Sequence, residues 1–460
     1  MQGVEIAGVV LIAIVACVFF GLYKFIQKLG SKNEVFDFER DYQRAITKPT
    51  YKKYKNGKEV EKMVYIGISG NKKSVFIPSD AKHVFVCGTT GSGKTVALSN
   101  FIKAGAEHDY PMLVIDGKGD TDAGSLLYIV KKMCPERKVY IINFNEPAKS
   151  DKYNPFKNTN TDVIKDMLIN MTNWSEEHYK YNTERYIQRL LKLLAMEKVE
   201  ISLDSLTRYL PVDNFNKLSK DLSIRELITK EERIEDSELA KTSGKIAEAA
   251  AARFATIKES NLGQVFDASG IDIYTALEEN AVILFILNPL LYPEMSPLIG
   301  NLIVIDSKKT VSKFFEHKKQ RIFYILDEIN AYASKSLLDL VNKSRSANIT
   351  CILATQSLSD LDAVSEQFKE QIIENCNNYI ALRQNSSVNA EHWASVFGTR
   401  ETMQATYQIK EGASTELGSL RKTREFIYHP DDIKLLKAGT AIFLSRDKMV
   451  HTKVKINKPF

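Results

Sequence analysis

A glycine-rich octapeptide, residues 88–95, contains the residue types that bind the phosphates of a nucleotide. It follows a short apolar run at 84–87, precedes a stretch with helical spacing, and matches G-x-x-x-x-G-K-[ST] at every required position. Glycines let backbone N–H groups surround an anion, and the N-terminus of the following helix adds positive potential. The alternative is a chance glycine-rich turn, which would need neither the strand nor the helix. We therefore predict a nucleotide site formed by Gly88, Thr89, Thr90, Gly91, Ser92, Gly93, Lys94 and Thr95.

The chemistry of ATP hydrolysis requires two residues of this loop and an acidic pair further along the chain. Lys94 is expected to reach the β- and γ-phosphates, and the Thr95 hydroxyl to bind Mg²⁺. An apolar run at 321–326 ends in Asp327 and Glu328. Asp327 would hold Mg²⁺ through its water shell, and Glu328 would polarise the attacking water. Such a pair alone is weak evidence, but with the phosphate loop it predicts an ATP hydrolase that uses ATP and Mg²⁺.

Two further polar residues are candidates for the site. Gln356 follows the apolar run 350–355, and ligands of open α/β sheets bind at such strand ends, so Gln356 is expected to sense the γ-phosphate or position water. Arg345 ends a stretch with helical spacing that begins at residue 336. It is a candidate arginine finger that would enter the site of a neighbouring subunit. An ordinary surface salt bridge is the alternative for Arg345.

The elements that must position these residues alternate between strands and helices. Apolar runs separated by helical stretches predict βαβ units on a parallel sheet, an α/β domain of the RecA-like P-loop type that comprises residues 64–157 and 265–460. Between residues 158 and 264 the spacing is helical throughout, which predicts an inserted all-α domain. Lysines and arginines interleave there with tyrosines and Trp174, a composition that suits single-stranded nucleic acid. Acidic residues are nearly as numerous, so a packing or regulatory module is the favoured alternative.

The N-terminal residues predict a membrane anchor. Residues 4–23 are apolar apart from Glu5, close to the roughly 20 residues that a helix needs to cross a bilayer. Lysines follow this run instead of preceding it, which excludes an ordinary signal peptide and places the N-terminus outside and the bulk in the cytoplasm. We predict a single-pass anchor at 1–26 in the inner or cytoplasmic membrane. A lysine-rich linker at 27–63 would contact membrane lipid or be merely solvated. A buried core helix is the alternative for the anchor.

Composition excludes some classes and permits others. The chain has 460 residues, enough for two or three domains, and a net charge of +6, which permits a polyanionic partner without requiring one. Five cysteines form no C-x-x-C pair, and the seven histidines form no H-E-x-x-H motif, so a metalloprotease is not expected.

Together the motifs resemble those of the coupling-protein ATPases of type IV secretion, the TraG/TraD family within the FtsK/HerA group. The resemblance covers about residues 60–455 and includes the helical insertion. The matching segments are 83–95, Asp116-Gly-Lys-Gly-Asp120, Leu326-Asp-Glu-Ile329, Ala354-Thr-Gln-Ser-Leu358, Glu374-Asn-Cys-Asn-Asn378, Phe397-Gly398 and His429-Pro-Asp-Asp-Ile-Lys-Leu-Leu436.

The resemblance implies a membrane-anchored homohexamer that hydrolyses ATP and delivers a relaxase-bound single strand of DNA to a type IV secretion channel. It also implies that Arg345 acts in trans. This chain departs from the family pattern in its single predicted span and in a turn that reads Asp116-Gly-Lys instead of Asp-Pro-Lys, with Asp120 in place of Glu.

Two other functions remain open on the sequence. A double-stranded DNA pump of the FtsK/SpoIIIE type shares the core, but this chain ends in two predicted strands, 440–444 and 451–456, without an appended reader domain. A receptor that binds nucleotide and recruits substrates without turning over ATP is the third possibility. The complete set of Lys94, Thr95 and the acidic pair disfavours it.

Overall fold

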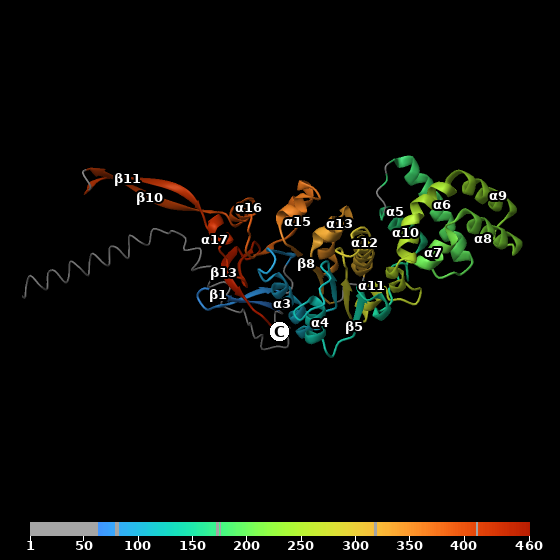
Figure 1. The fold of residues 1–460 in the computed structure, drawn as a ribbon, viewed down its shortest axis with the longest axis horizontal. Helices are drawn as coiled ribbons and strands as arrows, with labels where there is room; N and C mark the ends of the chain where they lie inside the picture. Colours follow the sequence, from blue (N-terminus) through green and yellow to red (C-terminus); the bar gives the residue numbers. More distant parts are fainter. Residues whose placement is uncertain (1–62, 79–81, 172–173, 175, 317–319, 411–412) are drawn as a thin grey trace, which may run out of the picture. The chain divides into compact units, whose positions relative to one another are not determined.

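The structure, a computed structural model, describes residues 63–460 apart from 79–81, 172–173, 175, 317–319 and 411–412 (Figure 1). The predicted anchor and nearly all of the predicted linker lie outside the described residues. Among the described helices, none combines the length and the apolar character needed to span a bilayer.

The fold is built on an eleven-stranded, mostly parallel sheet in the order β2-β1-β13-β12-β9-β3-β8-β7-β4-β6-β5. The strands from β9 to β5 in this order are mutually parallel, as the alternating sequence pattern predicted, whereas the strands from β2 to β9 pair antiparallel. The strands are β1 (Met63–Ser69), β2 (Ser74–Pro78), β3 (Val84–Cys87), β4 (Met112–Asp116), β5 (Val139–Asn143), β6 (Val282–Ile286), β7 (Ile322–Leu326), β8 (Ile349–Thr355), β9 (Asn378–Ala381), β12 (Thr440–Ser445) and β13 (Val450–Ile456).

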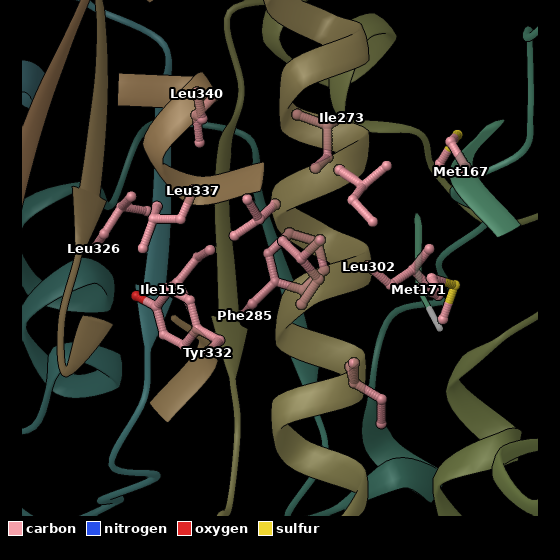
Figure 2. Packing of buried hydrophobic residues seen from close by; sticks show 14 of the residues in the cluster. Ile115, Met167, Met171, Ile273, Phe285, Leu302, Leu326, Tyr332, Leu337 and Leu340 are labelled. Carbon is pink, nitrogen blue, oxygen red and sulfur yellow. The ribbon is translucent and has the colours of Figure 1, made fainter. Parts of the chain in front are cut away.

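Every residue of β3, β4, β6, β7, β8 and β9 is buried, because helices cover both faces of a parallel sheet. Helices that follow or flank these strands are α3 (Lys94–Glu107), α4 (Leu126–Met133), α11 (Ile273–Glu278), α12 (Met295–Glu316), α13 (Lys335–Ser344), α14 (Leu358–Asp362), α15 (Glu366–Asn375), α16 (Ser387–Phe397) and α17 (Pro430–Lys434). Figure 2 shows how α12 joins this core to the helical segment: Phe285 of β6 lies toward one side of the helix, and Leu302 of α12 lies toward Met171.

Between β5 and β6 the structure describes a helical segment, in the region for which the sequence predicts the all-α domain at 158–264 (Figure 1, green). Its helices are α5 (Thr161–Asn170), α6 (Glu177–Met196), α7 (Leu203–Tyr209), α8 (Val212–Ile224), α9 (Lys230–Leu239), the π-helical turn η2 (Ala240–Gly244), α10 (Lys245–Glu259) and the 3₁₀ turn η3 (Asn261–Val265). Tyr186 of α6 holds the segment together, since its ring centroid lies 4.6 Å from that of Phe215 and its hydroxyl donates to the Leu210 carbonyl.

Two strands near the C-terminus pair only with one another. β10 (Thr399–Lys410) and β11 (Ala413–Phe426) form a separate two-stranded sheet that the sequence analysis did not predict. The preceding helix, α16, is fixed to the main sheet by Trp393, which is fully buried and stacks on Phe85 of β3 at a centroid distance of 6.0 Å.

Candidate functional site

The glycine-rich segment forms a loop between β3 and α3, and neighbouring backbone holds both of its sides. The Thr89 N–H donates to the Arg383 carbonyl at 3.1 Å, and the Gly439 N–H donates to the Ser92 carbonyl at 2.8 Å. Gly91 and Gly93 have φ angles of +73° and +110°, which are natural for glycine and strained for other residues. The sequence therefore needs glycine at these positions for the backbone path itself.

A chain of side-chain contacts, buried at Lys94 and Glu328 and exposed at Thr90, joins the loop to the acidic pair Asp327 and Glu328, here called the Walker B pair. Lys94 Nζ lies 2.6 Å from Glu328 Oε1, and Gln356 Nε2 donates to the same oxygen at 2.9 Å. At its other end the Gln356 side chain accepts a hydrogen bond from the Thr90 hydroxyl at 3.0 Å. Since β3, β8 and β7 are neighbours in the sheet, their carboxyl ends bring these four side chains together from positions up to 266 residues apart.

Glu328 is held in an unusual backbone conformation. Its φ and ψ angles of 48° and 54° are left-handed, which costs a non-glycine residue roughly 1 kcal/mol or more. The Tyr332 hydroxyl donates to the Asp327 carbonyl at 2.9 Å, and the Glu328 N–H donates to Asp327 Oδ1 at 3.0 Å. These contacts fix the turn and aim the Glu328 carboxylate at Lys94.

Two carboxylates at adjacent strand ends have raised pKa values. Burial raises the pKa of Asp327 to about 7, with Lys94 opposing the shift and Glu328 adding to it. Asp116, at the end of β4, has its pKa raised to about 6, mainly by burial and against the hydrogen bonds it accepts from backbone. Both carboxyl groups are therefore protonated more easily than an ordinary aspartate, and a cation bound beside them would favour their ionised form.

The residues fit a polyphosphate and a divalent cation. The Ser92 hydroxyl is buried without a hydrogen-bond partner among the described residues, and the space where a Cβ of Gly91 would point is open. Thr95 is the second residue of α3, so its hydroxyl is placed at the helix N-terminus beside the loop. Hydroxyl and carboxylate oxygens, from Thr95 and Asp327, are the ligand type that Mg²⁺ prefers.

Arg345 is not part of the site within its own subunit. It follows α13, is exposed, and lies at the amino end of β8, whereas Gln356 follows the carboxyl end of that seven-residue strand. A strand of this length separates its ends by roughly 20 Å. In its own subunit Arg345 therefore lies too far from the loop to contact a bound nucleotide, and its action in a neighbouring subunit stays a prediction.

One acidic side chain near the site escaped the sequence analysis. Asp360 of α14 has its pKa raised, chiefly by burial and then by the negative charge of Glu328, so it lies within the field of the Walker B pair. It follows Gln356 by four residues in a short helix, and no motif in the sequence distinguishes it from a surface aspartate.

The fold is similar to that of solved bacterial coupling proteins. Crystal forms of the bacterial conjugative coupling protein TrwB share the fold: an unbound form gives a TM-score of 0.64 at 17% identity over 92% of each chain. Its complex with the ATP analogue ADPNP gives 0.61 at 17% identity over 92% of each chain, and its complex with ADP and Mg²⁺ gives 0.60 at 18% over 88% of this chain and 97% of that one.

A shorter sequence match is to an uncharacterized protein of Mycoplasma pneumoniae, 32% identical over 101 residues, which covers 22% of this chain and 67% of the relative. The family model described as the type IV secretion-system coupling protein DNA-binding domain matches residues 72–457. Since this match extends over most of the chain, the protein belongs to the type IV secretion-system coupling protein family.

Proposed function

We propose that this protein is a membrane-anchored, ATP-driven motor that recruits relaxase-bound single-stranded DNA and moves it to a type IV secretion channel. The observation that carries the proposal is that the buried Glu328 carboxylate contacts both the buried Lys94 and the half-buried Gln356, in a chain of the coupling-protein family. A protein that only binds nucleotide has no need of a carboxylate placed beside the phosphate-binding lysine.

The roles of the side chains follow from their positions. Lys94 binds the terminal phosphates, Glu328 accepts a proton from the attacking water, and Gln356 orients Glu328 and connects it to Thr90 of the loop. Thr95 and Asp327 would hold Mg²⁺, which supplies charge neutralisation at the phosphates. TrwB in complex with ADP and Mg²⁺ supports this assignment through the shared fold.

The proposal also includes the DNA substrate, the assembly of subunits and the location of the protein in the cell. The family supports DNA as the substrate. We infer a homo-oligomer because Arg345, remote from its own site, would complete a neighbour's site, and the resemblance to coupling proteins implies that this assembly is a homohexamer. The apolar run at 4–23 supports anchoring in the cytoplasmic membrane, with the bulk of the chain inside.

Conjugation frequency tests the proposal. A donor whose gene is deleted should lose transfer, and wild-type complementation should restore it. Lys94→Ala should not, because the loop then lacks its phosphate-binding cation. Lys131→Ala, which removes an exposed cation of α4, is the matched control and should restore transfer fully.

Other results would favour the two alternatives. Normal transfer with a defect in chromosome segregation would indicate a double-stranded DNA pump. Transfer restored by Lys94→Ala, together with background ATP hydrolysis by wild-type protein in the presence of DNA and membrane, would indicate a receptor without motor activity.

A further inference from the structure

The turn Asp116-Gly-Lys-Gly-Asp120 at the end of β4 has no role in the site as described so far, yet its backbone is tightly fixed. Asp116 Oδ1 accepts the N–H groups of Lys118 and Gly119 at 2.9 and 3.0 Å. Asn145 Nδ2 donates to the Gly119 carbonyl at 2.8 Å. Burial of the Asp116 carboxylate costs free energy of desolvation. The hydrogen bonds that it accepts fix the position of the Lys118 backbone.

The turn packs directly on the Walker B pair. Its strand, β4, pairs with β7, with Ile115 opposite Leu326. A Cβ placed on Gly117 would lie 2.8 Å from the Asp327 carbonyl oxygen and 2.9 Å from Glu328 Cβ, so only glycine allows this approach. Gly117, the residue before Lys118, therefore packs against the Cβ and backbone of Glu328, whose carboxylate contacts Lys94.

The Lys118 side chain is held far less firmly than its backbone. It is 50% exposed, and its amine forms an ion pair with Asp120, which is 46% exposed. It also lies in the fields of Asp116 and Asp327. A single partly solvated ion pair contributes about 1 kcal/mol or less, so the amine is free to exchange Asp120 for a stronger anion.

We propose that Lys118 is a second phosphate-binding cation, which leaves Asp120 to contact the terminal phosphate of ATP. Lys94 is the residue expected to contact that phosphate, and its amine contacts the Glu328 carboxylate. Gly117 packs against the Cβ of the same residue, so the Lys118 backbone is held next to Glu328, and the Lys118 amine lies in the field of Asp327, the predicted Mg²⁺ ligand. ADP lacks the terminal phosphate, so Lys118 would give the site its preference for ATP over ADP. This inference rests on the proposed ATP-binding function.

Equilibrium binding of fluorescent mant-ADPNP and mant-ADP to the purified full-length chain, with Mg²⁺, tests the proposal. Lys118→Ala should weaken mant-ADPNP binding about tenfold and leave mant-ADP binding within about twofold, because a charge-assisted contact is lost from one ligand only. Lys118→Arg should retain most of the preference. Asp120→Asn, which removes the competing anion, should tighten mant-ADPNP binding a few-fold.

Lys131→Ala is the control for the loss of one exposed lysine, here from α4, and should bind both ligands as wild type does. An unchanged ratio of the two affinities in Lys118→Ala overturns the proposal, as does equal weakening of both ligands. Failure of the proposed ATP-binding function gives a different result: wild type and Lys94→Ala would then bind mant-ADPNP equally poorly.

Discussion

The amine of Lys94 and the carboxylate of Glu328, 234 residues apart in the chain, lie 2.6 Å from one another with less than a tenth of either side chain exposed. The cation that should bind phosphate is thus already paired with the carboxylate that should activate water. On the proposed roles, a nucleotide would displace Glu328 from Lys94 on binding, and the same displacement would free Glu328 to act as the base. One exchange of partners would then couple nucleotide binding to activation of the base.

This exchange predicts that Glu328→Gln traps ATP. The amide cannot accept a proton from water, so hydrolysis should fall by about 100-fold or more. It also forms a weaker hydrogen bond with Lys94 than the carboxylate does, so ATP should bind roughly fivefold tighter. Measurement of single-turnover hydrolysis and of nucleotide retained after gel filtration checks both expectations. Hydrolysis at the wild-type rate would remove Glu328 from its proposed role.

A second prediction concerns pH and Mg²⁺. The pKa of Asp327 is raised from 3.8 to about 7, mainly by burial, so the folded protein retains this proton up to about neutral pH. The stability that the protonated group contributes is fully present below the unfolded-state pKa and is lost as the pH rises from there through about 7. Mg²⁺ requires the ionised form. Its affinity for the nucleotide complex should therefore fall about tenfold per pH unit below 7 and level off above it. Titration calorimetry at pH 6, 7 and 8 measures this slope.

Asp327→Asn is the control for that titration, since an amide has no proton to lose in this range. Its weaker Mg²⁺ affinity should vary little between pH 6 and 8. A wild-type affinity that is equally flat would show that Asp327 does not determine Mg²⁺ binding.

The sequence predicted those parts of the site whose residues lie close together in the chain and follow a known spacing. The phosphate loop is defined by the spacing of Gly88, Gly93 and Lys94, and the acidic pair by the strand that precedes it. The contact of Gln356 with Thr90 has no such rule, because it depends on the order of β3 and β8 in the sheet. The left-handed turn at Glu328 is likewise imposed by packing against Tyr332.

β9, which pairs parallel with β3 and antiparallel with β12, and the β10–β11 pair show the same limit for the fold. β9 is only four residues long and has polar residues close to both ends, so its apolar residues are too few to be recognised as a strand from the sequence. The residues at the start of β10 (399–404) and at the end of β11 (421–425) are mostly polar or charged, so no alternation of apolar residues indicates a strand there. Pairing of the two consecutive strands with one another, from Thr399 opposite Phe426 to Lys410 opposite Ala413, defines them in the structure.

A third prediction tests Arg345 as a finger in trans. Arg345→Ala should reduce ATP hydrolysis about 1,000-fold in uniform assemblies, the scale typical of such residues. Mixing it with Lys94→Ala subunits should recover part of the activity, because some interfaces then join an intact loop to an intact arginine. Arg321→Ala is unsuitable as a control since Arg321 contacts Thr350, so Lys343→Ala, an exposed neighbour, serves instead. Absence of recovery at every mixing ratio would count against the finger.

The last prediction concerns a buried ion pair that joins α12 to the chain that leads into the helical segment. Lys309 Nζ lies 2.6 Å from Asp306 Oδ1 and donates to the Pro155 carbonyl at 2.8 Å, while the Tyr153 hydroxyl donates to Asp306 Oδ2 at 2.8 Å. Burial raises the pKa of Asp306, and the Lys309 charge opposes that shift. Removing the cation alone should leave a buried carboxylate without compensation.

Lys309→Met should therefore lower the free energy of unfolding by about 3–5 kcal/mol, as measured in urea, whereas Asp306→Asn with Lys309→Met should recover most of that loss. The recovery is expected because the double variant contains neither charge and the amide can still accept from Tyr153. Additive losses from the two substitutions would show that the pair does not act as a unit and that packing, not charge compensation, stabilises this junction.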